Sequence, residues 1–262
     1  MDIRNFKATI KAPTPTTLEA IFQLQKALLD RYIGVEKLPQ YPIPIHDPGS
    51  QIIIKDFIAR VTEELGEAFE SYLKMFNQVN GDPKVFIPNL YNFNEEIADA
   101  IHFLVETCIF TGITVPMIIS YTKQSMLILH DKMPNTDDAF ELAYKVRPSL
   151  VSGFSNRYTL PEAEDNILIQ GGRYFHESMF DYTSVMMWEV TYHLQLARNA
   201  LKNKPWKQSH MASDENTFNN KIIEALLGLI HLCREVGINE EAFYNIYYAK
   251  NQVNHFRITS KY

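Results

Sequence analysis

The stretch that most constrains the fold is residues 94–106, read NEEIADAIHFLVE. Its segment 97–105 is apolar almost all the way round a helix, which is typical of a helix buried on every side. Yet Asp99 and His102 lie inside that segment, and Glu96 precedes Asp99 by one helical turn. A buried carboxylate is costly unless it is paired with a cation or bound to a metal. The sequence therefore predicts a core helix that carries charged groups.

A second acidic helix is predicted upstream, at residues 61–70. Its Glu64 and Glu67 are three residues apart, as are Glu96 and Asp99. Because residues at this spacing share a helix face, antiparallel packing of the two helices can bring four carboxylates together. Such a cluster is typical of hard divalent cations, Mg²⁺ or Mn²⁺. The alternative is a solvated acidic face, which is common at this spacing.

Composition narrows the class of protein. The chain has 262 residues, 46% of them hydrophobic, which suits one domain over residues 1–262. A net charge of −6 without a long basic stretch argues against nucleic-acid binding. The N-terminus lacks the apolar core of a signal peptide. The sequence contains no run of 18 apolar residues, so a membrane is not expected as a partner. Cys108 and Cys233 lie in apolar stretches and are interpreted as reduced core thiols. We expect a cytoplasmic protein, or one in the host cytoplasm if its source is viral.

Apolar residues recur near a period of 3.6, and no alternation typical of strands persists, so the predicted class is all-α. The expected helices are 17–33, 51–79, 92–110, 115–129, 136–146, 178–201, 217–236 and 240–256. The proline-rich residues 34–50 are interpreted as a surface connector, with a substrate lid as the alternative. Residues 147–177 have no clean period and are expected to form an irregular inserted segment.

The last predicted helix carries a basic, amide-rich face. Lys250, Asn254 and Arg257 fall at i, i+4 and i+7, and Asn251 is three residues before Asn254. Cations near a helix C-terminus complement the helix dipole, which is one explanation of the pattern. The other is a phosphate clamp, with Arg as a fork and Lys as a point charge. If this face lies opposite a metal-binding cluster, the metal would neutralise one side of a triphosphate and Lys250 and Arg257 would neutralise the other.

These patterns together resemble a known family. The two acidic pairs resemble the ExxE…ExxD signature of the all-α nucleoside triphosphate pyrophosphatases, which include the MazG-like enzymes and the dimeric dUTPases. Residues 250–257 with Tyr262 resemble the dimeric dUTPase tail KNxxNxxRQxxGY. Residues 99–103 resemble its DxWHF run, and residues 24–28 resemble its LQxxLN. The chain departs from this pattern at Leu29, where the family has an Asn that helps to read the base.

The resemblance implies the fold and the roles of the site residues. The fold would be a helical bundle of the all-α pyrophosphatase type that forms a homodimer. Two or three Mg²⁺ ions, for which Mn²⁺ can substitute, would be held by Glu64, Glu67, Glu96 and Asp99. Glu64 would also be the catalytic residue that orients the attacking water as a base. The β- and γ-phosphates would be held by Lys250, Arg257 and Tyr262. The base and sugar would be contacted by Gln25, His102, Asn251 and Asn254.

The activity that this resemblance implies is the hydrolysis of dUTP to dUMP and pyrophosphate. A related pyrophosphatase acting on dCTP and dUTP, or on another dNTP, is the alternative within the family. Asp99-x-x-His102 also resembles one of the two Glu-x-x-His motifs of ferritin-like di-iron proteins, but Glu189 and His193 are four residues apart rather than three. A non-catalytic helical binding protein is the remaining alternative.

Overall fold

The computed structural model describes residues 17–77, 83–129, 177–204 and 211–260. Over these residues every regular element is a helix, which confirms the predicted all-α class. The helices are α2 (Leu18–Glu36), α3 (Pro48–Asn77), α4 (Pro83–Thr111), α5 (Val115–Leu129), α7 (Glu177–Ala200), α8 (Glu215–Glu235) and α9 (Glu240–Ser260). The predicted helix 136–146 and nearly all of the predicted irregular segment 147–177 lie outside the described residues.

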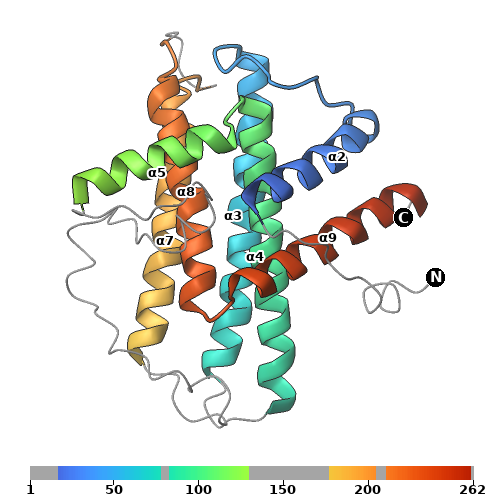
Figure 1. Ribbon diagram of the computed structural model, residues 1–262, viewed down its shortest axis with the longest axis vertical. Coiled ribbons are helices and arrows are strands. Elements are labelled where there is room, and N and C mark those ends of the chain that lie inside the picture. The colour runs from blue at the N-terminus through green and yellow to red at the C-terminus, as the bar shows by residue number, and fades with distance from the viewer. Residues whose placement is uncertain (1–16, 78–82, 130–176, 205–210, 261–262) are drawn as a thin grey trace.

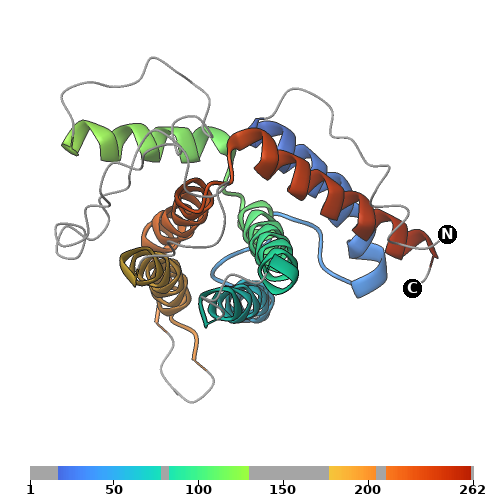
Figure 2. The ribbon, with the colours of Figure 1, turned by 90° about the horizontal axis from the view of Figure 1, so that it is seen from below.

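The helices are arranged in two parts. The two acidic helices, α3 and α4, run side by side as a hairpin, and the α7–α8 hairpin packs against them (Figure 1). Seen from below, α2 and α9 lie beside one another as a separate layer against α4 (Figure 2). Helix α5 crosses one end and contacts α2 and α8. Helices α2 and α9, which come from the two ends of the chain, thus both contact α4 and each other.

The helix ends follow local chemistry. The side chain of Thr17 caps the start of α2, accepting a hydrogen bond from the Ala20 amide at 3.1 Å. Asp214 caps α8 in the same way, accepting from the Thr217 amide at 3.0 Å. The bounds of α5 match the predicted 115–129.

Helix α4 differs most from its prediction. It begins at Pro83 instead of residue 92, and it continues through Pro88. A proline has no backbone N–H to donate. At the first helical position, which Pro83 occupies, this costs nothing, because an N–H there would have no partner within the helix. Helix α3 likewise begins at Pro48, inside the predicted connector, so the segment between α2 and α3 is only residues 37–47.

Burial follows the helical period and leaves the site residues at the edge of the core. On α4 the fully buried apolar side chains include Ile97, Ile101, Leu104 and Cys108. Cys108 and Cys233 are buried free thiols, as predicted. Glu96 and Asp99 are only partly buried and occupy the side of α4 that faces α2 and α9.

The contact between α7 and α8 requires a small residue. At Gly228 of α8, an added Cβ would come within 2.9 Å of Val190 Cγ2 on α7. The hairpin is therefore packed more closely at this point than any larger residue would allow without a shift.

No single described helix is long and apolar enough to cross a bilayer. Among the described helices, one pair, Pro88–Thr111 and Val115–Ser125, reaches the length and hydropathy of a span when taken together, but it is bent by 103°.

Candidate functional site

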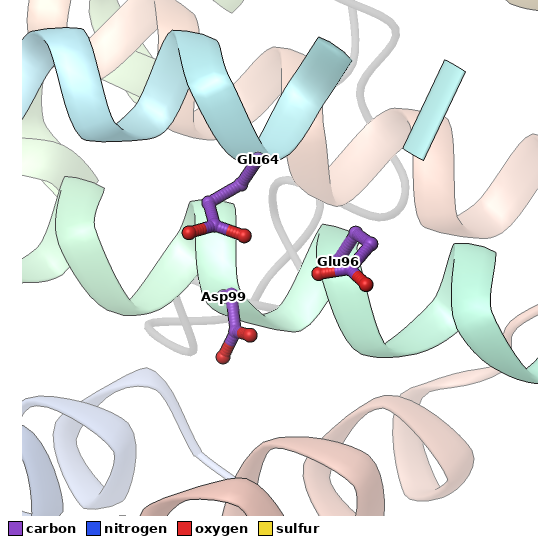
Figure 3. Close-up of side chains that lie close together, drawn as sticks. All are labelled: Glu64, Glu96 and Asp99. Atoms are coloured by element: carbon purple, nitrogen blue, oxygen red, sulfur yellow. The ribbon is translucent and has the colours of Figure 1, made fainter. Parts of the chain in front are cut away.

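Three carboxylates of the two acidic helices converge. Glu64 extends from α3 toward α4, where Glu96 and Asp99 lie one turn apart (Figure 3). One oxygen from each lies within 4.8 Å of the other two. The i, i+3 spacing places both α4 carboxylates on one face, and the hairpin brings Glu64 to the same place. The predicted convergence of the acidic pairs is thus found for three of the four residues.

Glu67, the fourth predicted ligand, is exposed and lies outside this group of three. Its charge still raises the pKa of Glu64 and of Glu96. It is one turn along α3 from Glu64, so it borders the cluster.

The three carboxylates are electrostatically unfavourable as a group. Burial, followed by the charge of Asp99, raises the pKa of Glu64 to about 8. Burial also raises the pKa of Glu96 and that of Asp99, and the positive charge of Lys250 acts against both shifts. Removal from water and mutual repulsion therefore both favour a bound cation at this position.

One cation of the chain already contacts the cluster. Lys250 of α9 lies 2.5 Å from Asp99, measured from Nζ to Oδ2, and the side chains are only 13% and 14% exposed. The basic face of the last helix therefore reaches the carboxylates. Lys250 is thus paired directly with a predicted metal ligand.

Beside the cluster lies a cavity of about 210 Å³ between α2, α3, α4 and α9. It is lined by Gln25, Leu28, Leu29, Tyr32, Glu36, Leu38, Phe57, Arg60, Glu64, Asp99, His102, Phe103, Glu106, Lys250, Asn254 and Arg257. Carboxylates and cations of the predicted site thus share one cavity with the predicted base-contacting residues Gln25 and His102.

A chain of hydrogen bonds joins three helices beside this cavity. Tyr247 Oη of α9 donates to Gln25 Oε1 at 2.6 Å. Gln25 Nε2 of α2 donates to Glu106 Oε1 of α4 at 2.7 Å. All three residues are buried, at 5% exposure or less. Since both ends of the Gln25 amide are used, its orientation is fixed.

His102 is buried and uncharged. Its Nδ1 lies 2.8 Å from the Ala98 carbonyl oxygen, so Nδ1 carries the hydrogen and donates it. The ring stacks on Tyr247 with the centroids 3.9 Å apart. Burial lowers the pKa of His102 to about 3. Nε2 is then an acceptor, and it is buried without a hydrogen-bond partner among the described residues.

Glu106 was not among the predicted site residues. Burial raises its pKa to about 8, although its hydrogen bond with Gln25 acts in the opposite direction. The sequence carried a signal for it, because Glu106 follows Asp99 by seven residues, two turns along the same face of an apolar helix. Over these turns α4 presents Asp99, His102 and Glu106 in succession to the cavity.

The predicted tail residues are not all on one face. Asn254 and Arg257 line the cavity with Lys250. Asn251 instead is fully buried, and its Nδ2 donates to the Leu24 carbonyl oxygen at 3.3 Å. It therefore holds α9 against α2, away from the lining of the cavity. Tyr262 lies outside the described residues.

The donor set of the cluster fits a divalent cation of the Mg²⁺ type. All three converging groups are carboxylates, and His102 turns its Nδ1 to the backbone. A second group of histidine and glutamate lies between α7 and α8, where His193 Nδ1 is 2.9 Å from Glu224 Oε2. Lys221 also contacts Glu224 there, so that carboxylate is neutralised by protein cations. A di-iron site with one histidine for each iron does not match either arrangement within the described ranges.

Comparison of the chain with models of known families, with curated proteins and with solved structures finds no match.

Proposed function

We propose that this protein is a metal-dependent deoxynucleoside triphosphate pyrophosphatase, which releases a nucleoside monophosphate and pyrophosphate. The observation that carries the proposal is the single cavity in which the carboxylates Glu64 and Asp99 meet the cations Lys250 and Arg257. A triphosphate needs both, since a metal neutralises one side of the phosphates and side-chain cations the other. dUTP is the substrate that the family resemblance implies, with dCTP as the alternative.

The chain's own residues supply positioning and proton transfer. Glu64, Glu96 and Asp99 would hold Mg²⁺ or Mn²⁺, with Glu67 adjoining. A bound divalent ion supplies charge neutralisation at the phosphate and lowers the pKa of a water molecule. Glu64 is the candidate base, because its carboxyl group lies in the cluster with Glu96 and Asp99, and the charge of an ion held there would favour the ionised form that accepts a proton.

The cations of α9 would hold the departing pyrophosphate. Lys250 must then exchange Asp99 for a phosphate oxygen when substrate and metal are bound, while Arg257 offers a fork to a second phosphate. This arrangement favours attack at the α-phosphorus, because the β- and γ-phosphates leave together. A homodimer remains a proposal from the resemblance, and the cytoplasmic location from the sequence.

The products test this reaction. With a panel of dNTPs and Mg²⁺, phosphorus NMR should show a dNMP and pyrophosphate. Appearance of a dNDP and inorganic phosphate would contradict attack at the α-phosphorus, and no release from any nucleotide would contradict the enzyme itself.

Metal dependence tests the role of the carboxylates. Turnover should cease in EDTA, and Asp99→Asn and Glu67→Gln should each nearly abolish it at fixed Mg²⁺ concentration. Glu70→Gln is a matched control, since Glu70 is exposed on the same helix as Glu67 and pairs with Lys74 at 2.8 Å. Full activity of Asp99→Asn, or in EDTA, would exclude the metal assignment.

A further inference from the structure

One ion pair joins the acidic and the basic side of the candidate site. Lys250 Nζ of α9 lies 2.5 Å from Asp99 Oδ2 of α4, and the two side chains are 13% and 14% exposed. Asp99 is one of the three carboxylates that converge on α3 and α4. Lys250 lines the cavity together with Arg257. Each partner of the pair therefore belongs to a group that would bind a different ligand: a divalent cation at Asp99 and a phosphate at Lys250.

In the described part of the chain, no other cation contacts Asp99. His102 approaches it, with Nδ1 3.9 Å from Asp99 Oδ1, but the imidazole ring is uncharged. The charge of Arg257 lowers the pKa of Asp99 without a hydrogen bond between them, and Arg257 Nη1 donates to Asn254 Oδ1 at 3.4 Å. If Lys250 left Asp99, a largely buried carboxylate would have no contacting cation.

The pair makes each ligand costly to bind alone. Breaking a largely buried ion pair leaves an uncompensated charge, which is strongly unfavourable. A divalent cation that took the Asp99 carboxylate by itself would leave the Lys250 ammonium group unpaired. A triphosphate that took Lys250 by itself would leave Asp99 unpaired beside Glu64 and Glu96. When both ligands bind, each charge has a new partner, so each ligand removes the cost that the other meets.

The helix that carries Lys250 is fixed on both sides of this residue. Tyr247 Oη donates to Gln25 Oε1 at 2.6 Å, and Asn251 Nδ2 donates to the Leu24 carbonyl oxygen at 3.3 Å. Both side chains are fully buried against α2. A lysine side chain has a flexible four-carbon stem. The pair can therefore open by rotation of the Lys250 side chain, without a shift of α9.

We propose that the Lys250–Asp99 pair makes the binding of the divalent cation and of the triphosphate mutually dependent, because each ligand frees the partner that the other needs. This inference rests on the proposed function and deepens it by stating how the two ligands regulate one another at that site. The coupling is reciprocal, as any coupling between two binding equilibria must be. Direct contact between the ion and the phosphates would also couple them, so the test measures each ligand alone.

Titration with Mn²⁺ in the absence of nucleotide tests the Asp99 side of the pair. Calorimetry should show that Lys250→Met binds Mn²⁺ at least tenfold more tightly than the wild type, because the ion no longer displaces an ammonium group. Arg257→Met is the matched control, since it also removes a cation that acts on Asp99, but one that makes no hydrogen bond to it. Its affinity should change less than threefold. An equal gain in both variants, or no gain in Lys250→Met, would overturn the inference while the metal site stands.

Titration with the α,β-imido analogue of dUTP in EDTA tests the Lys250 side. Asp99→Asn releases Lys250, so it should bind the analogue at least tenfold more tightly than the wild type. Glu96→Gln removes a negative charge from the same cluster but leaves the pair intact, so it should gain less than threefold. Relative to Lys250→Met, the double variant Asp99→Asn/Lys250→Met should show no gain, because the released group is absent.

The two titrations change opposite partners of the pair, so either one decides if a variant in the other does not fold. Equal affinities of Asp99→Asn and Glu96→Gln for the analogue would overturn the inference alone. If the wild type did not bind the analogue even with Mn²⁺ present, or if neither the wild type nor Lys250→Met bound Mn²⁺, the proposed function would fail together with the inference.

Discussion

At the scale of single residues, Glu106 couples its ionisation to folding. Its pKa is about 8 in the folded protein and 4.5 in the reference state. Between these values the unfolded chain has released the proton while the folded protein retains it, so stability falls as pH rises. The slope of this contribution is about 1.4 kcal/mol per pH unit, and it is fully lost only above the folded pKa.

Glu106→Gln should therefore lose less stability than the ligand-free wild type between pH 5.5 and pH 8.5. Urea unfolding of both proteins across this range measures the difference. Glu64, Glu96 and Asp99 also have raised pKa values, but both proteins contain them, so the difference isolates Glu106. Parallel pH profiles would show that Glu106 is ionised in the folded protein.

Arg257 is the second residue whose role a substitution can separate. If it holds a phosphate, Arg257→Ala loses a charge-assisted contact of about 1.5–3 kcal/mol, and kcat/KM falls about ten- to a hundredfold. Arg257→Lys should restore only part of this, because the charge stays while the planar fork is lost. If Arg257 only complements the dipole of α9, thermal melts would show a loss of about 0.3–1 kcal/mol and kcat/KM would not change.

At the scale of elements, the α7–α8 hairpin depends on one close contact. Gly228→Ala gains about 1 kcal/mol of helix propensity but must move Val190, whose Cγ2 would lie 2.9 Å from the new Cβ. Overpacking of this kind costs about 1–3 kcal/mol, so we expect a net loss of stability. Gly66→Ala is the matched control, because its Cβ would meet nothing within 4 Å and should stabilise α3. Equal melting shifts for the two variants would contradict this packing.

At the scale of the whole molecule, the site lies between two layers. One is formed by α2 and α9, from the two ends of the chain, and the other by α3 and α4. The α2–α9 layer contacts the α3–α4 hairpin around the cavity, so a ligand there binds both. A nonhydrolysable dNTP with Mg²⁺, at about 100 times its Kd, should stabilise the fold by about 2.7 kcal/mol. For a domain of this size that is a rise in Tm of roughly 5–10 °C.

Differential scanning fluorimetry with the α,β-imido nucleotide measures this shift, and Asp99→Asn is the control that should abolish most of it. The same ligand should slow amide hydrogen exchange in α9, which supplies Lys250, Asn254 and Arg257. If Mg²⁺ alone raised the Tm and the nucleotide raised it no further, the ion would bind at the cluster but no triphosphate would bind beside it.

The sequence alone determined what depends on neighbours along the chain. The helical class and the bounds of α5 follow from local periodicity and side-chain chemistry. So does the shared face of Glu96 and Asp99, because a spacing of three residues is one helical turn wherever the helix packs.

Tertiary structure alone decided which of these faces meet. It placed Lys250 on Asp99, turned Asn251 toward α2, left Glu67 exposed, and joined Gln25, Glu106 and Tyr247 across three helices. These contacts depend on how far each helix is rotated about its axis when it packs. That rotation is set by the fit of many side chains distant in sequence, which a spacing pattern along one helix does not contain.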